Sequence, residues 1–170
     1  RQMCIRDSAF LDHDYANKYV QRYSDNNMPW YYLVAAFWGG QEGSLMFWSV
    51  VLAVITAIVI WQNRDQNRDV LPTVIAVLMV VQAFFLLLMI VDANPFATFR
   101  INEPPINGRG LEPLLQNPAM TFHPPSILSG YVWWTVPFAF AVAAMIHKRL
   151  NDSWIRTTRR YAVVSWGFLS

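Results

Sequence analysis

The sequence predicts an all-α integral membrane protein with three complete transmembrane helices, a truncated fourth helix and structured loops on the outer side. Of the 170 residues, 55% are hydrophobic and only 14% are charged, whereas a soluble domain carries about 25% charged residues. The hydrophobic residues form blocks of about 20 residues, the length of a helix that crosses a bilayer. The basic residues gather in short segments between these blocks, and the net charge of +2 is too small to indicate nucleic-acid binding.

The first segment, residues 1–8, is expected to be a non-native leader. It does not begin with Met, has no apolar run and differs in character from the residues after it. It contains Cys4, the only cysteine of the chain, so no internal disulfide can form.

Residues 9–43 form the next segment, which we expect to lie outside the membrane. Its first part is polar and aromatic, without a periodic pattern from which a structure can be predicted. Residues 28–38 are aromatic and uncharged, which suits a short element lying in the lipid headgroup region. Glycines at positions 39, 40 and 43 break this element where the chain turns into the membrane.

Four apolar blocks provide the membrane helices. They predict complete spans at residues 44–61, 70–91 and 125–147, and the start of a truncated fourth at 161–170. The turn 62–69 contains two arginines and the loop 148–160 contains five basic residues, whereas the longer loop 92–124 contains only two arginines. The positive-inside rule therefore assigns the two basic segments to the cytoplasm, and the longer loop and the leading segment to the outside.

The loop 92–124 is rich in Pro, Gly and Asn, because NPF, EPPINGRG, QNP and HPP follow one another. A loop of this length is either disordered or a structured functional element. Its apolar residues favour a packed structure; they are Phe96, Phe99, Leu111, Leu114, Leu115, Met120 and Phe122.

His123 is the strongest candidate for chemistry, at the mouth of the third predicted span. Pro124 disfavours a helical conformation at His123, and Pro125 suits the first position of a helix. We therefore expect an extended His123 just before the helix, beside the positive end of its dipole. Such a fixed imidazole suits an axial ligand of haem iron, and the helix end suits a haem propionate. The alternative is an ordinary histidine that hydrogen-bonds to loop carbonyls.

Other candidates lie near the ends and middle of the spans. Trp38 and Glu42 precede the first span, where the carboxylate of Glu42 either caps the helix or binds a cationic partner. Trp133 and Trp134 can stack on a flat ligand or pack against a neighbouring helix. His147 is expected to complement the negative end of the third helix. The sequence has no phosphate loop, nucleophile elbow, carboxylate dyad or zinc spacing, so hydrolase and kinase functions have no support.

Three linked motifs resemble those of a known family. The runs WGGQEGSLMFW, DANPF and GRGLEPLLQNPAMTFHPP, the last followed by GYV and VPFAFA, are similar in order and spacing to an early part of the cytochrome c-type biogenesis haem lyases CcmF and NrfE. The resemblance covers residues 9–170, as part of a much longer family chain. The sequence departs from the family at Gln41, where some members have histidine, at Glu112, and after the HPP motif at Ser126, Leu128, Ser129 and Trp133.

The resemblance implies a multi-pass protein of the bacterial inner membrane, with functional loops in the periplasm. It implies a haem lyase, which receives haem from a chaperone and joins it by thioether bonds to the CxxCH cysteines of apocytochrome c. The implied partners are this chaperone, apocytochrome c and its thiol-handling maturation partners.

His123 matches the first of the family's two periplasmic haem ligands, with Pro124 and Pro125 positioning it. The resemblance implies that the second ligand, and the transmembrane histidines that hold a b-type haem in the family, lie beyond Ser170. This fragment alone is therefore expected to be inactive. The alternative function is a non-catalytic membrane transporter or assembly scaffold, in which the HPP loop is only structural.

Overall fold

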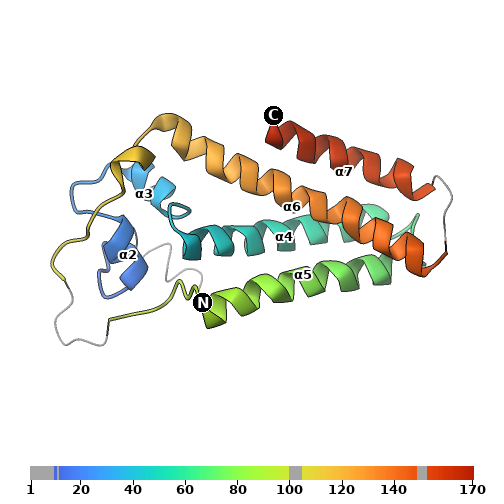
Figure 1. Ribbon diagram of the computed structural model, residues 1–170, viewed down its shortest axis with the longest axis horizontal. Helices are drawn as coiled ribbons and strands as arrows, with labels where there is room; N and C mark the ends of the chain where they lie inside the picture. The colour runs from blue at the N-terminus through green and yellow to red at the C-terminus, as the bar shows by residue number, and fades with distance from the viewer. Residues whose placement is uncertain (1–9, 11, 100–104, 149–152) are drawn as a thin grey trace. The chain divides into compact units, whose positions relative to one another are not determined.

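The computed structural model describes residues 10, 12–99, 105–148 and 153–170 (Figure 1). It divides into two compact units, of which the first comprises Arg1–Met46 and Met89–Pro124 and the second comprises Phe47–Leu88 and Pro125–Ser170. The expected non-native leader, with Cys4, lies outside the described residues.

The described residues are mostly helical, as predicted. The helices are α2 (Lys18–Tyr23), α3 (Trp30–Ala36), α4 (Gln41–Asn63), α5 (Leu71–Val91), the short 3₁₀ helix η1 (Pro113–Leu115), α6 (Pro118–Ile146) and α7 (Ser153–Leu169). The only β-type pairing among the described residues is an isolated bridge between Asn17 and Thr98.

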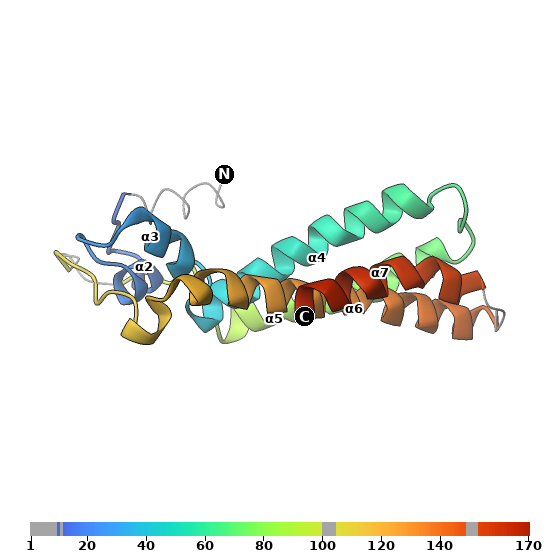
Figure 2. The same ribbon diagram turned by 90° about the horizontal axis from the view of Figure 1, so that it is seen from above.

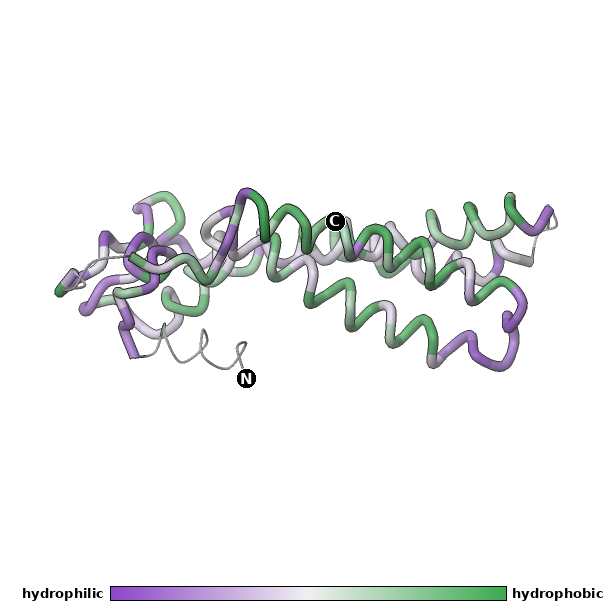
Figure 3. Tube along the Cα trace, turned by 90° about the horizontal axis from the view of Figure 1, so that it is seen from below, coloured by the Kyte–Doolittle hydropathy of each residue, from purple (hydrophilic) through white to green (hydrophobic). Residues whose placement is uncertain are grey.

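Three of these helices are long and apolar enough to cross a membrane. They are α4 with 23 residues, α5 with 21, and the 26-residue part of α6 from Thr121 to Ile146. Figure 3 shows these helices mainly in the colour of hydrophobic residues, whereas the turn between α4 and α5 is hydrophilic. A helix satisfies its own backbone hydrogen bonds, as a lipid environment requires of a spanning segment. The protein is therefore a membrane protein with three helices capable of spanning.

The start of α7 corrects one prediction. Residues 148–160 were expected to be a loop, but α7 begins at Ser153. Its inward face consists of Thr158, Tyr161 and Ser165, which are all buried. Two of the three are small hydroxyl residues, so the helical spacing of this face does not appear as a hydrophobic stripe in the sequence. Helix α7 is not among the three that can span, so the fourth transmembrane helix stays a prediction.

Tyr161 is the centre of the second unit and is only 2% exposed. Its ring stacks on Trp133 and Phe140 of α6, with centroids 6.0 and 6.3 Å away. Its hydroxyl accepts a hydrogen bond from Asn63 Nδ2 at 2.8 Å and donates one to Gln62 Oε1 at 2.9 Å. One side chain of α7 therefore joins α6 through its ring and α4 through its hydroxyl.

A close approach fixes α7 against α6 further along, and the two helices run beside each other in Figures 1 and 2. Ser165 Oγ donates to the carbonyl oxygen of Gly130 at 2.6 Å. A Cβ at Gly130 would lie 2.6 Å from Leu169 Cγ. Small residues at such a crossing let membrane helices approach closely enough for side-chain-to-backbone hydrogen bonds.

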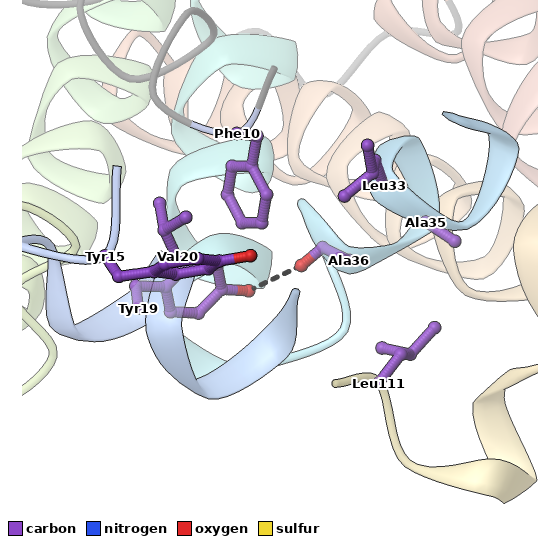
Figure 4. Packing of buried hydrophobic residues seen from close by; sticks show 8 residues of the cluster. All are labelled: Phe10, Tyr15, Tyr19, Val20, Leu33, Ala35, Ala36 and Leu111. Atoms are coloured by element: carbon purple, nitrogen blue, oxygen red, sulfur yellow. Dashed lines mark hydrogen bonds between the residues drawn. The ribbon is translucent and has the colours of Figure 1, made fainter. Parts of the chain in front are cut away.

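The first unit has its own core, built by α2, α3 and the segment before η1. Eight buried residues form it, as Figure 4 shows: Phe10, Tyr15, Tyr19, Val20, Leu33, Ala35, Ala36 and Leu111. Helix α2 begins because the side chain of Asn17 accepts hydrogen bonds from the backbone N–H groups of Tyr19 and Val20 at 2.8 and 3.3 Å. Its six residues are too few to give a periodic signal, which is why the sequence did not predict it.

The predicted packing of the loop 92–124 holds for part of its apolar residues. Leu111 is buried in the core of the first unit, and Leu115 packs against that core. Leu114, Phe96 and Phe122, by contrast, are exposed. Two leucines of the loop thus pack in or against the core of the first unit, whereas other apolar side chains of the loop are exposed.

Candidate functional site

The start of α6 positions His123, and it corrects a second prediction. The helix begins at Pro118 and not at Pro125, so His123, Pro124 and Pro125 all lie within it. Asn117 Oδ1 accepts a hydrogen bond from the backbone N–H of Ala119 at 3.0 Å, and Pro118 takes the first helical position. The expectation of an extended His123 just before the helix is therefore wrong. An asparagine cap followed by proline is a stronger start signal than the conformational bias of a residue that precedes proline.

Pro124 and Pro125 nevertheless alter the helix around His123. A proline has no N–H, so it cannot donate to the carbonyl group four residues earlier. The carbonyls of residues 120 and 121 therefore lack their usual helical partners. Residue 120 lies three positions before His123, which places it on the same face of the helix. The prolines thus alter the backbone hydrogen bonding of the helix around His123 instead of holding the residue extended.

The side chain of His123 is exposed, as is its neighbour Phe122, which is 73% exposed. An exposed neutral imidazole can donate its lone pair to a metal. Within the described ranges, no group of three or more His, Cys, Asp or Glu side chains could hold a metal ion. A zinc ion needs three or four protein ligands, whereas haem iron takes four bonds from its porphyrin and needs only one or two side chains. A single exposed imidazole such as that of His123 is enough for one axial position of a haem.

The segment that leads to His123 is fastened to the core of the first unit. Tyr32 Oη of α3 donates to the carbonyl oxygen of Gln116 at 2.8 Å. Gln116 Nε2 in turn donates to the carbonyl oxygen of Leu111 at 2.7 Å. Since Leu111 is a core residue, the backbone just before α6 is held from two sides. These hydrogen bonds fix the position of the first residues of α6 relative to the core of the first unit.

The turn between α3 and α4, which carries the WGGQEG motif, is fixed by Tyr19. The hydroxyl of Tyr19 lies 3.0 Å from the carbonyl oxygen of Ala36 and 3.1 Å from that of Phe37. It also accepts a hydrogen bond from the N–H of Gly40 at 3.0 Å. Figure 4 shows the contact with Ala36. One buried hydroxyl therefore ties α2 to both ends of this turn.

Two glycines of the motif make this approach possible. A Cβ at Gly43 would overlap the carbonyl oxygen of Phe37 and the hydroxyl of Tyr19. A Cβ at Gly40 would meet the ring of Tyr23. The sequence was interpreted as using these glycines to turn into the membrane, but Gly43 already belongs to α4. Its role is close packing of the first turn of α4 beneath α2.

Trp38 and Glu42 are placed in the same turn. The carbonyl oxygen of Trp38 accepts a hydrogen bond from Ser44 Oγ at 2.9 Å, and its ring makes an edge contact with Phe37. Glu42 lies in the first turn of α4, with Oε1 3.9 Å from Nη1 of Arg22. A carboxylate there complements the positive helix end. Both interpretations of Glu42 stay predictions.

The remaining candidates belong to the second unit. Trp133 stacks on Tyr161, so its ring has a packing partner there, whereas Trp134 is exposed. His147 Nε2 lies 2.8 Å from Thr73 Oγ1 of α5, a contact that the sequence did not predict. Among these three, packing and hydrogen bonding within the unit account for Trp133 and His147.

Comparisons with known proteins agree with the motifs. The family model of the cytochrome c assembly protein matches residues 38–170. The cytochrome c-type biogenesis protein CcmF of Pseudomonas fluorescens is 39% identical over 161 residues, which are 95% of this chain and 24% of the relative. CcmF of Escherichia coli K12 is 39% identical over 163 residues, covering 96% of this chain and 25% of the relative.

The probable cytochrome c-type biogenesis protein NrfE of Escherichia coli K12 is 35% identical over 162 residues, covering 95% of this chain and 29% of the relative. The chain thus spans about a quarter of the length of the curated relatives that it matches. No solved structure was found to match it. Since the family model covers well over half of the chain, the chain belongs to the cytochrome c assembly protein family.

Proposed function

We propose that this chain is part of a haem lyase of cytochrome c maturation, and that His123 supplies one axial ligand to its haem. The observation that carries the proposal is the exposed imidazole of His123 in the first turns of α6, within a chain of the cytochrome c assembly family.

The residues of the first unit would act as a binding platform. His123 would donate an imidazole lone pair to iron and so orient the bound group, while the exposed ring of Phe122 offers an apolar contact. The Tyr32–Gln116–Leu111 hydrogen bonds would hold the backbone just before α6, and so the start of the helix that carries His123, against the core of the first unit. When bound, haem supplies the vinyl groups that become linked to the CxxCH cysteines of an apocytochrome.

The proposed location is the bacterial inner membrane. The positive-inside rule assigns the basic segments 62–69 and 148–160 to the cytoplasm, and the segments 9–43 and 92–124 to the periplasm. His123 would then meet a haem chaperone, apocytochrome c and its thiol-handling maturation partners on the periplasmic side. The remaining haem ligands would come from parts of the family's longer chain.

The ligand role is tested by the absorption spectrum of haem in the protein purified from membranes. We expect His123→Ala to weaken binding of the haem that His123 ligates by at least about 10-fold, because even an outer hydrogen-bond partner of a metal ligand is worth that much affinity. Haem held by other histidines should remain. His147→Ala is the matched control, since it removes an imidazole that already contacts Thr73 in the second unit. Unchanged haem content and spectrum in His123→Ala would leave only a scaffold or transporter role for this segment.

A further inference from the structure

The rotation of α7 about its own axis is fixed by three buried side chains. Thr158, Tyr161 and Ser165 follow one another at helical spacing, and all face the interior of the second unit. The hydroxyl of Tyr161 accepts a hydrogen bond from Asn63, and the hydroxyl of Ser165 donates one to the carbonyl oxygen of Gly130. The opposite face of α7 is therefore also fixed, and it is turned away from the rest of the unit.

That opposite face changes in character along the helix. It carries Arg156 and Arg159 in its first two turns, and both are exposed. It continues with Val163 and Trp166, which are 58% and 67% exposed. The four positions are spaced by three, four and three residues, so they form one stripe. The stripe is basic where α7 begins and apolar further along.

A third arginine of α7, Arg160, differs from these two because its guanidinium contacts Asn63 and Tyr161 of the same unit. Its Nη2 donates to the hydroxyl of Tyr161 at 2.8 Å and lies 3.4 Å from Asn63 Oδ1. Its guanidinium is centred 4.7 Å from the ring of Tyr161. Among the described residues, neither Arg156 nor Arg159 has an ion pair. Both side chains are exposed.

The position of these charges along the chain indicates the partner. The spanning part of α6 ends at Ile146, and α7 begins at Ser153. Arg156 and Arg159 therefore lie within a short distance of the membrane surface, where phosphate groups of anionic lipids are concentrated. Val163 and Trp166 follow toward the apolar region, which suits acyl chains and the interface respectively.

We infer that the Arg156–Arg159 face of α7 binds the phosphate headgroups of anionic lipids, with Val163 and Trp166 against their acyl chains. The charge of the face, its fixed rotation and its continuity with a spanning helix carry this assignment. Attraction of a basic residue to an anionic surface is worth roughly 5-fold in binding per residue. The inference is independent of any role of His123.

Native mass spectrometry of the protein, purified in detergent and supplied with equal amounts of phosphatidylglycerol and phosphatidylcholine, tests it. We expect the protein to retain phosphatidylglycerol in preference to phosphatidylcholine. The double variant Arg156→Gln/Arg159→Gln should lower this preference by roughly 10-fold or more, since two charges are lost. Arg156→Lys/Arg159→Lys should preserve most of it, because the attraction depends on charge.

The matched control removes two basic residues of the first unit, as Lys18→Gln/Arg109→Gln, and should leave the preference unchanged. An equal preference in the Gln variant and the unaltered protein would overturn the inference, because protein or solvent would then cover this face. A loss of preference in the Lys variant as large as in the Gln variant would also overturn it. Elution as a single species in gel filtration checks that each variant is folded. We expect every arginine variant to fold, because the side chains of Arg156 and Arg159 are exposed.

Discussion

Replacing Gly43 by alanine should destabilise the first unit by about 3 kcal/mol or more, the upper range for forcing extra volume into a packed interior. The added methyl group would overlap the carbonyl oxygen of Phe37 and the hydroxyl of Tyr19. The backbone at Phe37 cannot move away without breaking the turn between α3 and α4, which Tyr19 holds by its hydrogen bonds. Hydrogen exchange of the amides in α2 and α3 would measure the loss as faster exchange.

The sign of this effect is itself diagnostic. Alanine is favoured over glycine in a helix interior by about 1 kcal/mol, so a position with free space should gain stability. Gly167→Ala in α7 is the matched control, because no atom lies within 4 Å of a Cβ built there. Gly40→Ala should fall between the two, since the ring of Tyr23 can rotate aside. A Gly43→Ala variant as stable as Gly167→Ala would contradict the close packing of the WGGQEG turn.

Replacing Tyr161 by alanine should cost the second unit about 3–5 kcal/mol, the range for removing a large buried aromatic ring. The ring stacks on Trp133 and Phe140, and its loss would leave a cavity between α6 and α7. The hydroxyl has a separate role, because it accepts hydrogen bonds from Asn63 and Arg160. Unfolding in sodium dodecyl sulfate, followed by tryptophan fluorescence, would measure both contributions.

Tyr161→Phe separates the ring from the hydroxyl. It keeps the stacking but leaves one N–H of the buried Asn63 amide without its partner, which should cost about 1–3 kcal/mol. Tyr131→Phe removes a hydroxyl from an exposed tyrosine of α6 and should have no measurable effect. If Tyr161→Phe unfolds at the same detergent concentration as Tyr131→Phe, the polar contacts at Tyr161 do not contribute to stability.

The spanning helices could be predicted from the sequence because their signal is simple. Long runs of Val, Ile and Leu in α4 and α5 mark the spans, and hydrophobicity alone finds them. The ends of the helices are harder to predict, because hydrogen-bonding side chains decide them. Asn117 caps α6 well before the apolar block begins. The buried face of α7 contains Thr158 and Ser165, so the first turns of this helix show no hydrophobic pattern in the sequence.

The haem-ligand role of His123 stays a prediction. His123 was singled out from its neighbours in the sequence, and the structure places its side chain on the surface. Its helical conformation was not predicted, because a residue before proline favours an extended backbone, whereas α6 begins at Pro118 and includes His123. Tyr19 and Tyr161 were also missed. Each acts through a hydroxyl that meets residues distant in sequence, and no local pattern reveals such contacts.

The ligand role of His123 is tested most directly by chemical rescue of cytochrome c maturation. Cells whose maturation depends on this protein would carry His123→Gly, which removes the imidazole, and would be grown with and without imidazole in the medium. We predict loss of haem-stained c-type cytochromes without imidazole and their recovery with it, because free imidazole can occupy the vacated axial position. Full maturation in His123→Gly cells without imidazole would contradict the role of His123 as a haem ligand.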